Sequence, residues 1–182
     1  MKNSRCMLVV TGMVLISIAL VITGCATPAK PSAMASSLIV TNHHQGSVSV
    51  NVTGGNKTNP MWKSDISSED FSTALEETLR HSALFSSVAA TNTDYRLEVQ
   101  LVRVTTPLLG STSTVTVVSE WRLVRVRDSA VVSDEYFATP FTATMGDGGF
   151  FVIKRTRIAN EGAARANIAK GIQRLSELNL EK

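Results

Sequence analysis

Cys25 is the residue with the clearest potential for chemistry. It directly follows Ile22, Thr23 and Gly24, so one aliphatic residue and two small residues precede the thiol. A thiol can accept a diacylglycerol group, and cleavage on its N-terminal side would free an amine for a further acyl chain. Small residues before the thiol let the backbone enter a peptidase. Because one acyl chain anchors a protein only marginally, several chains on one residue would hold it firmly at a membrane.

The residues before Cys25 have the three parts of a secretory signal peptide, which we assign to residues 1–24. Lys2 and Arg5 give a positively charged start, and a nearly continuous apolar run over 7–22 follows. This run is shorter than the roughly 20 residues of a relaxed bilayer span, and no cluster of positive charge follows it. The sequence therefore predicts export and cleavage rather than a permanent span.

The run Ile22-Thr23-Gly24-Cys25 resembles the lipobox of bacterial lipoproteins. The resemblance implies a covalent lipid of the palmitate type on Cys25 as the chain's membrane anchor. Ala26-Thr27 follows with no Asp, which by resemblance to known sorting implies the outer membrane of a Gram-negative cell, with the domain facing the periplasm. The alternative is an ordinary signal peptide cut after Ala26, because Gly24-Cys25-Ala26 is also a small-x-small site.

Other groups of reactive residue types are better explained as structure. His43, His44 and His81 could bind a metal, but neighbouring side chains in an extended segment point apart and no carboxylate is close in sequence. The glycine-rich run 146–149 lacks the Gly-Lys-Ser/Thr ending of a phosphate loop and indicates a mobile turn. No Gly-x-Ser-x-Gly elbow occurs. We therefore expect no enzyme activity, no metal and no cofactor apart from the lipid.

Charge and cysteine content exclude further classes. The formal charge is +3, and removal of Lys2 and Arg5 with the leader leaves 16 basic against 15 acidic residues, a net charge of +1. A near-neutral domain gives no electrostatic case for binding nucleic acid. Cys6 lies in the leader, so a chain acylated on Cys25 has no free thiol and no disulfide.

Two surface features are candidates for binding. The first is a basic patch that would attract anionic lipid or glycan, with an ordinary solvated strand face as the alternative; it comprises Arg103, Arg122, Arg125 and Arg127. The second is the apolar run Phe150, Phe151, Val152 and Ile153. If exposed, this run would dock a partner or contact a membrane, and the alternative is an edge strand packed in the core.

The remaining elements define one domain behind a tether. Residues 25–37 are rich in Ala, Ser and Pro and predict a flexible tether, followed by a single domain over 38–182. Period-two alternation predicts strands at 47–52, 94–104, 114–127 and 130–144, with a possible bulge where the inward phase changes after Leu123.

Two amphipathic helices complete the domain. One begins after a Ser67 cap and ends near Ser82, and the other runs from about Asn160 to Leu178. We expect an α+β fold, a two-layer sandwich in which two helices cover an antiparallel sheet of about four strands.

Several of these segments together resemble a known group of proteins. They are the lipobox, the pattern Phe-x-x-Ala-Leu-x-x-x-Leu over 71–79 before Leu84-Phe85, the run 94–99, and a meander that ends in a C-terminal helix. The whole is similar to small envelope lipoproteins such as the ABC-type transport auxiliary, LptE-like and YajG-like lipoproteins. The resemblance implies a noncatalytic accessory of an envelope transport or assembly complex, and it transfers no site residues. The alternative is a lipoprotein that binds lipid or glycan.

Overall fold

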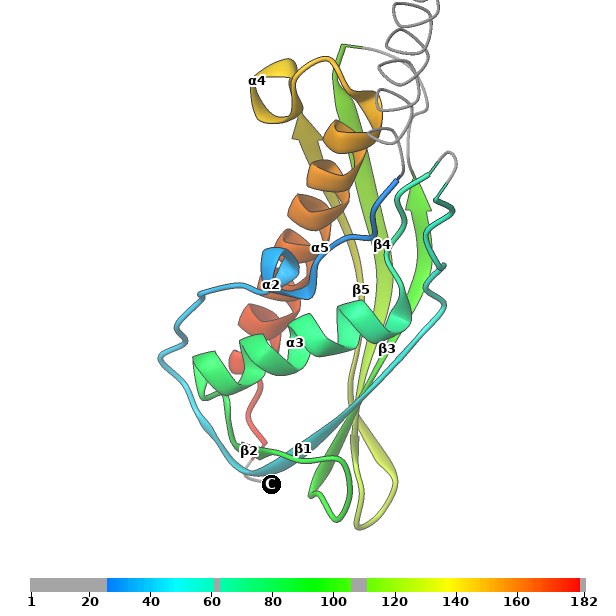
Figure 1. The fold of residues 1–182 in the computed structure, drawn as a ribbon. Coiled ribbons are helices and arrows are strands. Elements are labelled where there is room, and N and C mark those ends of the chain that lie inside the picture. Colours follow the sequence, from blue (N-terminus) through cyan, green and yellow to red (C-terminus); the bar gives the residue numbers. More distant parts are fainter. Residues whose placement is uncertain (1–25, 61–62, 106–110, 181–182) are drawn as a thin grey trace, which may run out of the picture.

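The computed structural model describes residues 26–60, 63–105 and 111–180. The expected signal peptide, the lipobox residues Ile22, Thr23 and Gly24, and Cys25 itself lie outside the described residues. The elements in chain order are α2 (Pro31–Met34), β1 (His44–Thr53), α3 (Ser68–Ser82), β2 (Phe85–Val88), β3 (Tyr95–Thr105), β4 (Ser113–Arg125), β5 (Ala130–Ala143), α4 (Met145–Gly148) and α5 (Val152–Ser176) (Figure 1).

The strands form one sheet in the order β2-β1-β3-β4-β5. This confirms the α+β fold and corrects two details of it. The sheet has five strands rather than four, because the short strand β2 follows α3. It is mixed rather than antiparallel, because β1 pairs in parallel with both β2 and β3. A parallel pair needs a crossover connection, and α3 supplies it between β1 and β2.

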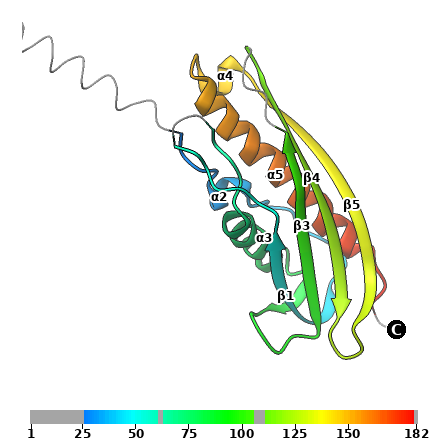
Figure 2. The same cartoon turned by 90° about the vertical axis from the view of Figure 1, so that its right-hand side faces the viewer.

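Helices α3 and α5 cover one face of the sheet, the short helix α2 lies against both of them, and no described helix covers the other face (Figure 2). The side chains alternate between these two environments. On β3 the polar residues Arg96, Glu98 and Gln100 take the uncovered face, where Glu98 and Arg122 are cross-strand partners. The inward residues of β3 that the sequence predicted are all buried: Tyr95, Leu97, Val99 and Leu101.

Helix α3 begins and ends where the sequence predicted. The Ser67 hydroxyl accepts a hydrogen bond from the backbone N–H of Asp70 at 3.0 Å and donates one to its carboxylate at 2.7 Å. Ile66 and Phe71, the expected hydrophobic staple, are both buried. The helix ends at Ser82, and Ala83 takes the left-handed conformation that commonly terminates helices.

The long strands β4 and β5 form a hairpin with one interruption. Their register shifts between Leu123 and Val124, at the place where the sequence suggested a bulge. The extra residue is Val132 of β5, because β4 keeps its register with β3 there and Val124 pairs with Arg96. A second shift, between Leu101 and Arg103, interrupts the pairing of β3 with β4. The inward phase of β4 is unchanged past the first shift, so Val124 lies beside Arg96 on the uncovered face.

Helix α5 begins at Val152, well before the predicted start at Asn160. Its predicted buried stripe is confirmed, since Ala164, Ile168, Ile172 and Leu175 are at most 4% exposed. The helix approaches the sheet closely because two of its inward positions are glycine. A Cβ atom on Gly171 would lie 2.5 Å from the ring of Trp121, and one on Gly162 would lie 2.4 Å from the ring of Phe141.

The core gives a first prediction. Leu75 on α3 and Leu97 on β3 are both fully buried, as the sequence predicted. Replacing either leucine with alanine should lower the free energy of unfolding by about 2–5 kcal/mol, because transfer free energy is lost and a cavity remains. Urea unfolding would measure this, with Val131→Ala on the exposed hairpin as a control that leaves the midpoint nearly unchanged. Unchanged midpoints for both leucine variants would contradict the assigned faces.

The glycine contacts give a second prediction. In Gly171→Ala the added methyl group overlaps the Trp121 ring, and such overpacking costs about 1–3 kcal/mol. This exceeds the gain of up to about 1 kcal/mol that alanine brings to a helix interior, so the free energy of unfolding should fall. Gly146→Ala is the matched control, because its nearest neighbour, the Thr144 hydroxyl, lies 3.4 Å away. Equal thermal midpoints for the two variants would refute the close approach.

Candidate functional site

The segment that follows Cys25 packs along helix α5. The Thr27 hydroxyl accepts a hydrogen bond from Arg157, the backbone N–H of Lys30 donates to the Glu161 carboxylate at 3.1 Å, and Arg165 donates to the carbonyl of Ala33. These partners advance in the same order on both segments. The chain therefore runs parallel to α5 from its N-terminal part onward.

The expectation of a flexible tether over residues 25–37 is wrong for its described part, 26–37. Ala29 and Met34 are at most 1% exposed, and the short helix α2 lies against both α3 and α5. The Ala, Ser and Pro composition that suggested flexibility also suits a tightly packed turn, because these side chains lose little entropy and Pro31 occupies the favoured first position of a helix. The large apolar residue Met34 could have indicated packing, but the overall composition of the segment pointed to flexibility.

The glycine-rich run 146–149 forms a hydrogen-bonded turn rather than the mobile turn that the sequence suggested. The Asp147 carboxylate accepts hydrogen bonds from the backbone N–H of Thr144 at 2.7 Å and from its hydroxyl at 2.9 Å. These bonds cap the single-turn helix α4. Arg155, which is 1% exposed, donates to the carbonyl of Gly149 and ties this turn to the start of α5.

The apolar run 150–153 is not an edge strand. Phe150 is 86% exposed and Phe151 is 69% exposed, while Val152 and Ile153 are partly buried in the first turn of α5. Met145, on the neighbouring turn, is a further exposed apolar residue that the sequence analysis missed. We call Met145, Phe150 and Phe151 the aromatic patch.

The aromatic patch and Ala26 lie at the same end of the molecule. Figures 1 and 2 both show α4, the start of α5 and the beginning of the described chain together, far from the hairpin that joins β4 to β5. We call the first end the N-terminal pole and the hairpin end the opposite pole. The backbone N–H of Ala26 bonds to the carbonyl of Pro60 at 2.8 Å, which fixes the chain there.

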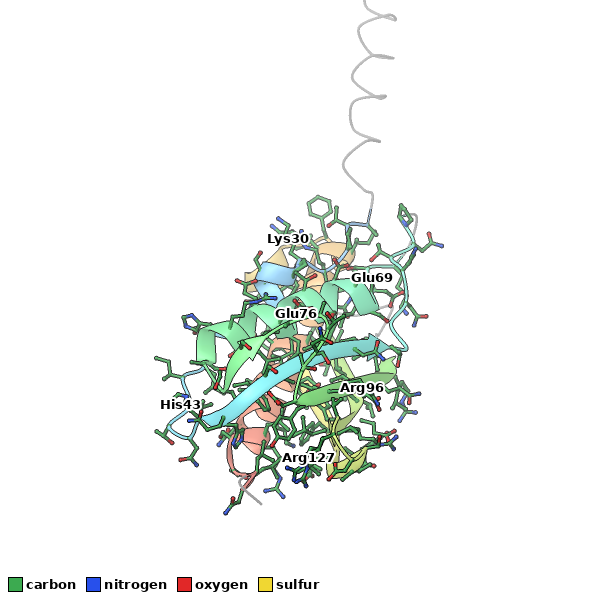
Figure 3. All side chains as sticks on the ribbon, turned by 90° about the horizontal axis from the view of Figure 1, so that it is seen from below. Lys30, His43, Glu69, Glu76, Arg96 and Arg127 are labelled. Carbon is green, nitrogen blue, oxygen red and sulfur yellow. The ribbon has the colours of Figure 1, made fainter. Side chains whose placement is uncertain are left out.

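Two of the histidines that could have bound a metal instead form hydrogen bonds with different backbone carbonyls. His43 directly precedes β1 and shares a hydrogen bond with the carbonyl of Ala83 (Figure 3). His44 is buried, and its Nε2 lies 2.8 Å from the carbonyl of Leu175. Within the ranges that the structure describes, no three His, Cys, Asp or Glu side chains gather as a metal site requires.

The arginines of the predicted basic patch do not form one cation cluster. The Arg122 guanidinium pairs with Asp134 at 3.1 Å and with Glu120 at 2.9 Å, and these partners raise its pKa. Arg125 and Arg127 both face Asp128 at 3.7 Å near the hairpin turn. In Figure 3, Arg127 lies toward this hairpin, away from α3. The ordinary alternative, a solvated strand face with paired charges, therefore describes these residues better.

A buried polar cluster between α5 and the sheet was not recognised from the sequence. The Asn167 amide oxygen accepts from the Ser119 hydroxyl at 2.7 Å and from the Trp121 indole at 3.3 Å, and the Asn167 amide nitrogen donates to Thr139. Each of these polar groups has a partner, so the cluster fixes the position of α5 and offers no free group for chemistry. An asparagine on the apolar stripe of a helix was the available signal.

Hollows that the structure describes are on the surface. One of about 260 Å³ lies on the uncovered sheet face and is lined mainly by polar side chains, including Asn51, Gln100 and Glu120. Another of about 540 Å³ lies beside the hairpin, next to Asp94 and Arg127. No helix in the described part of the chain combines the length and apolar character needed to cross a membrane.

Comparison with solved structures shows what the fold is similar to. One similar structure is a Xanthomonas campestris protein of the DUF330 family, with a TM-score of 0.60 and 13% identity over 80% of this chain and 92% of that one. A candidate lipoprotein from Caulobacter crescentus has a TM-score of 0.51 and 15% identity over 71% and 87%. A hypothetical protein from Chlamydia trachomatis has a TM-score of 0.51 and 9% identity over 71% and 96%.

At these identities the likeness concerns the fold alone. No protein-family model matches the sequence, and no curated protein matches it significantly. The overall fold is thus similar to that of these proteins. No role transfers from them to this chain.

The cap at Asp147 gives a prediction on pH. The hydrogen bonds from the backbone N–H and then the hydroxyl of Thr144 hold the pKa of the Asp147 carboxyl below its ordinary value. The stabilisation of the turn is therefore fully present above the unfolded-state pKa and is lost as pH falls through the lower folded-state pKa. The amide resonance of Thr144 should follow this titration in NMR spectra, and it should not titrate in Asp147→Asn. The same titration in both proteins would assign it to another group.

Proposed function

We propose that this protein is a membrane-anchored lipoprotein of the cell envelope, with the lipid on Cys25, and that it is a noncatalytic accessory of an envelope transport or assembly complex. The domain faces the periplasm from the outer membrane. The fold likeness to a candidate lipoprotein and to a DUF330 family protein supports a lipoprotein. The lipobox-like run Ile22-Thr23-Gly24-Cys25 supports it independently.

One observation carries the accessory role: no helix among the described residues covers one face of the five-stranded sheet, while the opposite face is filled. Large side chains such as Trp121, Leu123 and Ile168 are at most 2% exposed and occupy the space between sheet and helices. This leaves the uncovered face and the 14-residue edge strand β5 as the surfaces available to a partner. Tyr136, which is 60% exposed on β5, is a candidate contact of the kind enriched in interfaces.

The alternative is a glycan-binding lipoprotein. The polar hollow of about 260 Å³ on the uncovered face favours it, because its amide and carboxylate side chains suit hydroxyl groups. Lipid binding inside the domain has less support, since ligand pockets are concave and mostly apolar. Both described hollows are open to solvent; the smaller one has a mainly polar lining, and the larger one has a mixed lining that includes Tyr95, Val126 and Leu180.

Capture of the intact protein from membranes tests the proposal. The purified membrane form should show a chain that begins at Cys25 and carries acyl mass, and Cys25→Ser should abolish that mass because it removes the acceptor thiol. Envelope transport or assembly proteins should co-purify with the acylated chain. Their recovery should fall with Cys25→Ser, since the anchor raises the effective concentration near membrane partners.

A pair of surface variants locates the partner's contact. Tyr136→Asp should reduce co-purification by placing a charge on the uncovered face, whereas Gln173→Asp adds the same charge on an exposed position of α5 and should not. Both variants should retain acyl mass and the wild-type thermal midpoint. Full complementation by an unanchored domain, a mature chain beginning at Thr27 without lipid, or steady turnover of a small substrate would refute the proposal.

A further inference from the structure

The aromatic patch is exposed, but hydrogen bonds hold the backbone turn that carries it. Met145, Phe150 and Phe151 stand on a turn that is closed by the Thr144–Asp147 cap on one side and by the buried Arg155 on the other. A Cβ on Gly148 would lie 2.6 Å from the Arg155 side chain, so the turn packs directly against that arginine. The two phenylalanines therefore expose apolar surface on a hydrogen-bonded turn, and this surface is not buried within the domain.

The patch lies close to the first described residues of the chain. Thr27 contacts Arg157, and a helix rises about 1.5 Å per residue, so this contact stands roughly 9 Å along α5 from Phe151. The chain runs toward the start of α5 as it is followed back from Thr27 to Ala26. An anchor on the residue before Ala26 is joined to a backbone that is itself hydrogen-bonded to Pro60, which leaves little slack.

From this placement we infer that the aromatic patch inserts into the interfacial region of the lipid bilayer beside the anchor and sets the orientation of the domain on the membrane. The inference rests on the proposed acylation of Cys25. The short connection holds the N-terminal pole against the lipid headgroups, and phenylalanines there exchange water for the headgroup–acyl boundary. The exposed Lys154 follows on α5, and its stem can lie along this boundary while its ammonium group reaches lipid phosphates.

The orientation has a structural consequence. With the N-terminal pole on the membrane, α5 and the long strands rise away from it, and the β4–β5 hairpin is the part of the described domain farthest from the surface (Figures 1 and 2). The uncovered sheet face is then steeply inclined to the membrane plane and faces sideways, where a neighbouring envelope protein can reach it.

Single-cysteine labelling of the full acylated chain tests the inference. Cys6 leaves with the signal peptide and the Cys25 sulfur is blocked by lipid, so Phe151→Cys carries the reactive thiol. Val131→Cys at the opposite pole is the matched control, because Val131 is also apolar and 55% exposed. Each purified protein is labelled with an environment-sensitive fluorophore and reconstituted into vesicles of phosphatidylethanolamine and phosphatidylglycerol.

The label at position 151 should shift to shorter emission wavelength, lose quenching by iodide and gain quenching by a lipid-borne nitroxide, while the label at 131 keeps its aqueous behaviour. A third reporter, Met145→Cys, should show the same shift and lose it in a background with Phe150→Ser and Phe151→Ser. This second result separates insertion by the phenylalanines from mere proximity to the anchor.

The outcomes distinguish the inference from the proposed function. Acyl mass on Cys25 with an aqueous label at position 151 would overturn the inference and leave the anchored lipoprotein intact. Absence of acyl mass would overturn the proposed function. Shielding of the 151 label in a chain that begins at Ala26, without lipid and without vesicles, would also overturn the inference, because a second copy of the chain would then cover the patch.

Discussion

Two aromatic rings of the sheet, Trp121 on β4 and Phe141 on β5, lie against helix α5 at positions where the helix carries glycine. This close approach determines the separation of the two layers. The polar cluster around Asn167 lies in the same interface and fixes the helix at one position on the sheet, since any shift would leave buried polar groups without partners. Helix α2 then packs on the surface that α5 and α3 present, so the first described residues depend on this contact as well.

Local pattern was sufficient for much of the fold. The cap at Ser67, the staple of Ile66 and Phe71, and the alternation on β3 each depend on residues close in sequence, and their effects could be read directly. The bulge suggested after Leu123 coincides with a shift of register, although the extra residue lies in β5 rather than in β4. Such features are predictable because the physics that produces them acts within a few residues.

The features that the sequence did not reveal depend on distant contacts. The parallel pairing of β1 with β3 leaves no mark on either strand, and the four residues of β2 are too few to show alternation. Residues 26–34 resemble a linker until the surface of α5 that receives Met34 is known. The apolar run 150–153 fits a buried strand as well as an exposed turn, and only the position of Arg155 decides between them.

The pairing of residues 27–33 with α5 joins segments that are 130 to 132 positions apart, so for an exported chain it bears on the order in which the domain folds. A chain that crosses a membrane from its N-terminus delivers α5 last. Until then α2 can pack only on α3 and lacks the surface of α5, and four residues cannot hold a helix alone. If the chain is exported and acylated on Cys25, as proposed, the segment after the cysteine reaches its final packing only when α5 arrives. The modifying and cleaving enzymes would then meet this segment before it is fully packed, and the packing of α5 would complete the contacts that hold the domain close to its anchor.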